Sequence, residues 1–123
     1  MFELSVEVSF AAAHQLRGYQ GKCENMHGHN WRVQVTVIAQ ELNNIDIAID
    51  FHDLKQLARE VIAPLDHAYL NDLFPFTEKN PSSENIAKWI FDSTKKKIMD
   101  ENVRVSAVTV WESDTASATY YES

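Results

Sequence analysis

The sequence predicts an α+β fold in which two helices cover one face of an antiparallel, four-stranded sheet. Two observations support this fold class. Apolar and polar residues alternate near both ends of the chain, as in half-buried strands, whereas the middle carries apolar residues at helical spacing. The chain has 123 residues and no internal repeat or linker, so residues 1–123 are expected to form a single domain.

The first two predicted strands span residues 2–10 and 29–39. Every second side chain in each segment is apolar, so these side chains share one face of the sheet. The positions are Phe2, Leu4, Val6, Val8 and Phe10 in the first strand, and Trp31, Val33, Val35 and Val37 in the second. The two strands are expected to pair as a long hairpin. Alternating isoleucines predict a short third extended segment over residues 45–49, after a turn at Asn43.

Two helices are predicted next. Asp50 is a suitable N-cap for the first helix, which Pro64 ends, and Ser82 or Ser83 caps the second. Their apolar stripes are Leu54, Leu57, Ala58, Val61 and Ile62 in the first, and Ile86, Ile90, Phe91, Thr94 and Ile98 in the second. Residues 103–112 and 118–122 have the pattern of the last two strands, joined by a turn.

The predicted sheet is small and leaves backbone edges and apolar surface that a second copy of the chain could cover. Four strands leave two unpaired edges, and the segment around Val110 and Trp111 is apolar on both faces. We therefore expect the chain to form a homo-oligomer.

The composition argues against several classes of function. A formal net charge of −7 disfavours non-specific binding to nucleic acid, and an anionic substrate would need local lysine or arginine side chains. No apolar run is long enough to cross a bilayer, and the first residues lack the pattern of a secretory leader. A single cysteine makes no internal disulfide. We expect a cytoplasmic protein with no membrane partner.

The stretch from Cys23 to Trp31 is the first candidate for chemistry. His27 and His29 are two residues apart at the start of a strand, so their imidazoles point to the same face and can bind one metal ion. His14, at the end of the first strand, is the natural third ligand. Zinc is the expected ion, because imidazole suits it and it takes about four ligands.

Two other interpretations of this stretch remain open. If Cys23 is the fourth ligand, the site is closed and structural, whereas three histidines alone leave an open position for catalysis. Alternatively, His14, His27 and His29 are polar residues at strand ends without any metal, because an isolated His-x-His occurs often by chance.

Asp66, His67 and Glu112 are the remaining candidates. A carboxylate beside an imidazole makes an acid–base pair, and His67 near Cys23 would lower the pKa of its thiol. Glu112, at the end of an apolar strand, can accept hydrogen bonds from the guanidine-like edge of a pterin or guanine. The alternative is that all three are solvated polar residues at the ends of elements.

Seven short motifs occur together along the chain. They are Ala-Ala-His at 12–14, Cys-x3-His-Gly-His-Asn at 23–30, Asp-Phe at 50–51, Leu-Asp-His at 65–67, Leu-Asn at 70–71, Pro-Ser-Ser-Glu-Asn-Ile at 81–86 and Val-Trp-Glu at 110–112. In this combination, over nearly the whole chain, the sequence resembles the 6-pyruvoyl-tetrahydropterin synthase superfamily. The resemblance implies the tunnelling fold, in which trimers form a barrel, pair into hexamers and hold active sites between subunits.

The resemblance also implies roles for individual residues. At matching positions, His14, His27 and His29 would bind Zn²⁺ and Cys23 would be the base. Asp66 and His67 would be relay partners of the cysteine, and Glu112 would hold the pterin ring and join the relay. Lys22 and Arg17 lie in the loop where a triphosphate would bind.

The spacing between Cys23 and His27 resembles the bacterial 6-carboxy-5,6,7,8-tetrahydropterin synthase branch, since the pyruvoyl enzymes usually have a longer gap. That branch implies a zinc-dependent lyase of queuosine biosynthesis, which converts 7,8-dihydroneopterin triphosphate to 6-carboxytetrahydropterin, acetaldehyde and triphosphate. The alternatives are a pyruvoyl-type lyase or a non-catalytic, zinc-stabilised binding module. The chain departs from the family pattern at residues 44–49, which lack the usual glycine and methionine, and at Ser82 and Ser113, where threonine is common.

Overall fold

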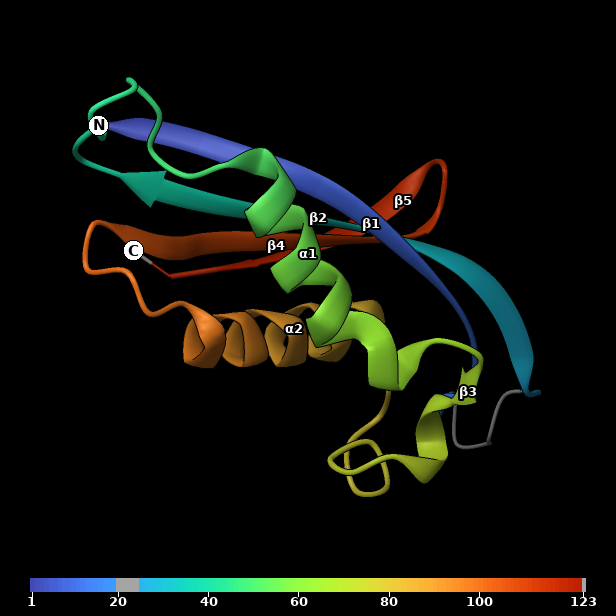
Figure 1. Cartoon of the computed structure of the whole chain (residues 1–123). Helices are drawn as coiled ribbons and strands as arrows, with labels where there is room; N and C mark the ends of the chain where they lie inside the picture. Colours follow the sequence, from blue (N-terminus) through green and yellow to red (C-terminus); the bar gives the residue numbers. More distant parts are fainter. Residues whose placement is uncertain (20–24, 123) are drawn as a thin grey trace.

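The computed structural model describes residues 1–19 and 25–122 (Figure 1). Its main elements are β1 (Phe2–His14), β2 (His27–Ala39), α1 (Phe51–Ile62), α2 (Ser83–Lys97), β4 (Val103–Ser113) and β5 (Ala116–Tyr121). Three short elements lie between the helices: η1 (Ala63–Leu65), β3 (Ala68–Tyr69) and η2 (Leu70–Asp72). The predicted α+β class is confirmed, with both helices on the same side of the sheet (Figure 1).

The sheet has the strand order β3-β1-β2-β4-β5. β1 and β2 form the predicted hairpin, and their antiparallel pairs run from Phe2 with Ala39 to His14 with His27. The prediction of four strands is wrong, because Ala68 and Tyr69 add a fifth strand that pairs in parallel with the end of β1. Two residues are too short a segment to show the alternation that reveals longer strands.

The extended segment predicted for residues 45–49 is also wrong, because the structure has turns and bends there. The side-chain oxygen of Asn43 accepts hydrogen bonds from the backbone N–H groups of Ile45 (3.0 Å) and Ile47 (3.2 Å). Asp46 has a φ of 67° in the left-handed region, which no strand residue adopts. A local side-chain cap therefore replaces ladder pairing in this segment.

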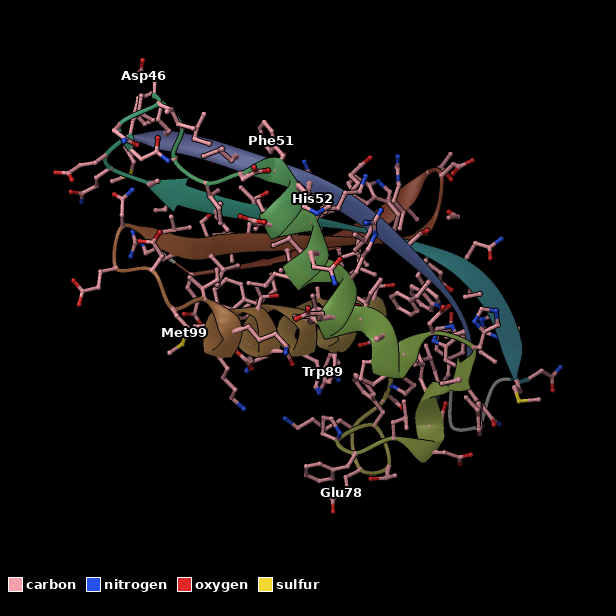
Figure 2. The ribbon with its side chains drawn as sticks, viewed as in Figure 1. Asp46, Phe51, His52, Glu78, Trp89 and Met99 are labelled. Carbon is pink, nitrogen blue, oxygen red and sulfur yellow. The ribbon has the colours of Figure 1, made fainter. Side chains whose placement is uncertain are left out.

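The helices begin where the sequence predicts. Asp50 caps α1 by accepting from the backbone N–H of His52 at 2.7 Å, and α1 ends at Ile62, just before Pro64. Ser82 caps α2 by accepting from the N–H of Asn85 at 3.2 Å. Figure 2 shows Phe51 and His52 in the first turn of α1, where both are exposed. Neither helix in the described ranges is long and apolar enough to cross a membrane.

The two faces of the sheet differ sharply. On the helix side, Val33, Val35 and Val37 of β2 are fully buried with the apolar stripes of both helices. The other face is polar and exposed in this chain, with the Arg32 guanidinium 4.1 Å from the centre of the Trp111 ring. Arg32 therefore covers the aromatic side chain that made this strand look apolar on both faces.

Candidate metal centre

The three predicted ligands come from the open end of the β1–β2 hairpin. His14 pairs with His27 across the two strands, and Ala12 pairs with His29. Because paired residues and residues two apart share a face, this register places all three imidazoles on the helix side of the sheet. The two-residue spacing in β2 and the hairpin register together create the cluster.

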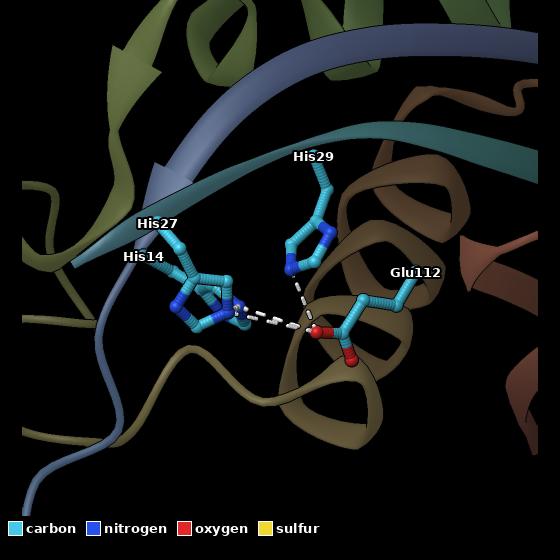
Figure 3. Close-up of side chains that lie close together, drawn as sticks. All are labelled: His14, His27, His29 and Glu112. Atoms are coloured by element: carbon cyan, nitrogen blue, oxygen red, sulfur yellow. Dashed lines mark hydrogen bonds and ion pairs between the residues drawn. The ribbon is translucent and has the colours of Figure 1, made fainter. Parts of the chain in front are cut away.

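The imidazoles converge on one point (Figure 3). The Nε2 atoms of His14 and His27 are 3.0 Å apart, and the ring centres of His27 and His29 are 4.7 Å apart. One potential ligand atom from each histidine and one from Glu112 all lie within 4.8 Å of one another. His14 is 2% exposed, whereas the other three side chains are partly accessible from solvent.

Glu112 is the residue that sequence reasoning placed in the site without predicting its contacts. Its Oε1 atom lies 2.8 Å from Nε2 of His29 and 3.5 Å from Nε2 of His14. The pairing of β4 with β5 shifts register between Trp111 and Ser113, so Glu112 lies at a bulge. Glu112 lies two residues after the buried Val110 in β4, so the alternation of the strand already places its carboxylate on the helix side, with the histidines.

The hydrogen bonds of two rings determine their tautomers. Nδ1 of His14 lies 2.8 Å from the Pro81 carbonyl oxygen, and Nδ1 of His27 lies 2.8 Å from the Asn25 carbonyl oxygen. A carbonyl only accepts, so each Nδ1 carries the proton and each neutral ring has a lone pair on Nε2. Two such lone pairs at 3.0 Å repel unless a metal ion or an added proton lies between them. This donor set fits a metal held by three imidazoles, with carbonyls orienting two of the rings.

An aromatic wall backs the centre. The Trp31 side chain is fully buried and packs edge-on against His14 and His29, with ring centres 4.9 Å and 5.3 Å apart. Its indole N–H donates to the Ala12 carbonyl at 3.2 Å, which satisfies its one polar atom. Trp31 therefore excludes water from one side of the centre and strengthens the interactions of any charge held there.

Asp66 and His67 pair as predicted. Asp66 Oδ1 accepts from the backbone N–H of Ala11 at 3.0 Å and lies 3.1 Å from Nδ1 of His67. The Ala11 hydrogen bond, and then the neighbouring His67, hold the pKa of the Asp66 carboxyl below its usual value. His67 has a φ of 58°, and its backbone N–H donates to the Ala11 carbonyl at 2.6 Å.

The structure does not bring this pair to the histidine cluster. The His67 side chain is 82% exposed and lines an open cavity of about 550 Å³. Ala11, Ala13 and Asn30, which also line that cavity, alternate with the metal-site residues along β1 and β2. Since alternate residues face opposite sides, the cavity opens on the sheet face away from the helices. His29 also lines this cavity, whereas His14 and His27 do not.

Two other predicted residues, Cys23 and Lys22, lie outside the described residues. Arg17 is described, and one guanidinium nitrogen donates to the carbonyls of Phe76 (2.5 Å) and Lys79 (2.9 Å). The Arg17 side chain thus ties the end of β1 to the loop before α2. Pro81 was not predicted as part of the site, although its motif was recognised, because only the folded chain places its carbonyl against His14.

Similarity to known proteins agrees with this geometry. A relative from Haemophilus influenzae described as 6-carboxy-5,6,7,8-tetrahydropterin synthase is 33% identical over 144 residues, which cover 99% of this chain and 100% of the relative. A dihydroneopterin monophosphate aldolase from Pyrococcus furiosus is 33% identical over 104 residues, 85% of this chain and 83% of the relative.

The fold has the same likeness. The structure of Caenorhabditis elegans 6-pyruvoyl tetrahydropterin synthase superposes with a TM-score of 0.85 at 27% identity, covering 99% of this chain and 96% of that one. Residues 3–123 match the family described as 6-pyruvoyl tetrahydropterin synthase. The motifs, the fold and these matches together show that the chain belongs to the 6-pyruvoyl tetrahydropterin synthase family.

Proposed function

We propose that this chain is a zinc-dependent lyase, a 6-carboxy-5,6,7,8-tetrahydropterin synthase of queuosine biosynthesis. Its substrate would be 7,8-dihydroneopterin triphosphate, and its products 6-carboxytetrahydropterin, acetaldehyde and triphosphate. The observation that carries the proposal is the convergence of His14, His27 and His29 with Glu112, whose potential ligand atoms all lie within 4.8 Å of one another. The relative from Haemophilus influenzae supports the choice of reaction.

His14, His27 and His29 would hold the metal and leave one position open for the substrate. Bound there, Zn²⁺ would act as a Lewis acid on the side-chain oxygens of the substrate and make the adjacent C–H bond more acidic. The Pro81 and Asn25 carbonyls orient the rings of His14 and His27, so that Nε2 of each is aimed at the ion. The buried Trp31 ring limits water at this side of the centre.

Cys23 would remove the proton from the substrate as a thiolate, and His67 would return protons elsewhere on the substrate. Asp66 supports this role of His67, because its carboxylate stays ionised and accepts from Nδ1 of the ring. The imidazole then presents Nε2 to the substrate. Keeping Cys23 off the metal preserves the open coordination position that the chemistry needs.

Glu112 would bind the pterin ring. A carboxylate accepts two parallel hydrogen bonds from the amino group and ring N–H of a pterin. The Glu112 carboxylate lies 2.8 Å from Nε2 of His29, so a pterin on Glu112 would direct its side chain at the metal. Ser83, whose hydroxyl donates to Oε2 of Glu112 at 3.5 Å, helps to orient that carboxylate.

The site would be completed by a second copy of the chain in a hexamer of paired trimers. Two observations support sharing. His67 lies on the sheet face away from the histidine cluster, and β1 pairs with β3 only at Ala12 and Ala13, which leaves its first part as an edge. The other outer strand of the described sheet is β5. Pairing of β1 edges with β5 edges would close a barrel and bring His67 of one subunit toward the metal of the next.

Product identity tests the proposed reaction. The purified chain, loaded with zinc and incubated with 7,8-dihydroneopterin triphosphate, should release acetaldehyde and a 6-carboxypterin. A pyruvoyl-type synthase would release triphosphate without acetaldehyde, and an aldolase would release a phosphorylated two-carbon aldehyde. Either of those product sets would replace the proposed reaction with its rival.

A non-catalytic zinc module is separated by chelation. A structural zinc site contributes directly to folding, so its removal unfolds the domain. The large apolar core of this chain lies between the sheet and both helices and is built from residues other than the proposed ligands. We therefore expect chelation to abolish turnover while circular dichroism still reports a folded chain.

A further inference from the structure

The chain that follows His14 is held by two asparagine side chains. Asn71, in η2, is buried, and its Oδ1 accepts from the backbone N–H of Gln15 at 2.9 Å while its Nδ2 donates to the Gln15 carbonyl at 2.8 Å. These two hydrogen bonds replace those that a neighbouring strand would make, at a position just beyond the end of β1. It holds in place the residue directly after the buried metal-site histidine.

Asn80 makes the same contact two residues further along. Its Oδ1 accepts from the backbone N–H of Arg17 at 2.8 Å, and its Nδ2 donates to the Arg17 carbonyl at 2.9 Å. Its own carbonyl accepts from Nδ2 of Asn85, in the first turn of α2, at 2.9 Å. Asn80 also immediately precedes Pro81, whose carbonyl accepts from Nδ1 of His14.

We propose that Asn71 and Asn80 are positioning residues for the metal centre. Asn71 holds the backbone of His14 from its C-terminal side, and Asn80 holds the carbonyl that orients its ring. A metal ligand must be held to within about 0.5 Å of its productive position. The inference depends on the proposed function, because it takes the histidine cluster to be a metal centre.

The chain offers a matched control. Asn102, near the start of β4, makes the same kind of clamp at the other end of the sheet. Its Oδ1 accepts from the backbone N–H of Glu41 at 2.9 Å, and its Nδ2 donates to the Glu41 carbonyl at 2.8 Å. Its Oδ1 also accepts from the backbone N–H of Gln40 at 3.1 Å, so a substitution there removes at least as many hydrogen bonds without touching the chain around His14.

The test compares Asn71→Ala, Asn80→Ala and Asn102→Ala in the full chain. Each protein is stripped of metal and titrated with Co²⁺, whose visible absorption reports ligand geometry, and its unfolding by urea is measured separately. Outer-shell changes typically weaken metal affinity about 10- to 100-fold. We expect that loss, with an altered Co²⁺ spectrum, in the Asn71 and Asn80 variants. Asn102→Ala should lose stability but keep the affinity and spectrum of the unchanged chain.

Wild-type Co²⁺ affinity and spectrum in both Asn71→Ala and Asn80→Ala would overturn the inference, whatever their stability. If an alanine variant does not fold, the aspartate variant at the same position, Asn71→Asp or Asn80→Asp, serves in its place. Aspartate keeps the acceptor for the backbone N–H of Gln15 or Arg17 but loses the donor to the carbonyl of that residue, so it should show the same weakening. Failure of the unchanged chain to bind Co²⁺ is a different result, because it would reject the metal centre itself.

Discussion

Nε2 of His14 lies 3.0 Å from Nε2 of His27, although a main-chain carbonyl already holds the proton of each ring on Nδ1. Two neutral imidazoles in this arrangement present lone pairs to each other. Glu112, with Oε1 3.5 Å from His14 and 3.8 Å from His27, adds negative charge to the same space. A metal ion or an added proton between the nitrogens would relieve this repulsion, and the cluster could hold such an ion.

Replacing one imidazole should remove the metal. Substitutions of residues that only orient a ligand weaken metal affinity by up to about 100-fold. We expect His29→Ala, which removes a ligand itself, to weaken zinc binding by more than this and to lose turnover. His52→Ala is the control, because His52 is exposed on α1 and outside the cluster. Metal content after dialysis, measured by atomic emission, checks both variants. Equal zinc in the two proteins would contradict the assignment of His29.

Cys23→Ala separates the open site from the closed one. If the thiol is the base and not a ligand, the variant should retain its zinc and lose about 10²- to 10⁴-fold in kcat, the range for removal of a general base. Zinc content and single-turnover rates are measured on the same sample. Loss of zinc together with turnover would instead support a closed, structural site with a sulfur ligand.

Glu112→Gln should separate pterin binding from metal binding. The amide keeps the shape of the side chain but loses its charge, and a hydrogen bond to a charged group contributes about 1.5–3 kcal/mol. We expect kcat/KM to fall by about 10- to 150-fold with zinc content unchanged. Loss of zinc from this variant would show that the carboxylate, which lies 2.8 Å from His29, is itself a ligand.

The carboxylate of Asp66 should make the folded chain less stable as the pH falls into the acidic range. Its pKa is lower in the folded chain, chiefly through the Ala11 N–H, so the unfolded chain binds more protons between the two values. The stabilisation is therefore present above the ordinary carboxyl pKa of about 3.9 and is lost as the pH falls through the lower, folded value.

Asp66→Asn tests that dependence by urea unfolding at pH 7 and at pH 3. The variant should be less stable than the unchanged chain at pH 7, and the difference should shrink at pH 3. Asp114→Asn, which removes an exposed carboxylate from the β4–β5 turn, is the control and should behave like the unchanged chain at both values. A difference for Asp66→Asn that is equal at the two pH values would contradict the proposed cause.

Mixed oligomers test whether the site is shared between subunits. His29→Ala and His67→Ala should each be inactive alone. When the two are unfolded, mixed in equal amounts and refolded, about one quarter of sites in a ring with heterologous interfaces would combine an intact cluster with an intact His67. Activity near that fraction of the unchanged protein is expected. No recovery in oligomers shown by mass spectrometry to be mixed would mean that His67 serves its own subunit.

Local patterns in the sequence predicted most elements of this fold. Alternation identified the hairpin strands, and Asp50 and Ser82 were recognised as helix caps, because each signal depends on neighbours within a few residues. The same local reasoning failed at residues 45–49, where the Asn43 side chain binds the backbone, and at β3, which is only two residues long. In both places the local structure depends on the hydrogen-bond partner of the backbone, which is the Asn43 side chain in one case and the end of β1 in the other.

The sequence by itself determined that His27 and His29 share a face, because side chains two apart in a strand point the same way. It also determined the Asp66–His67 pair, which is adjacent in the chain. Only the tertiary structure decided that Pro81 and Glu112 face the histidines and that His67 lies across the sheet from them. These relationships depend on strand register and loop packing between residues distant in the chain, which no local pattern encodes.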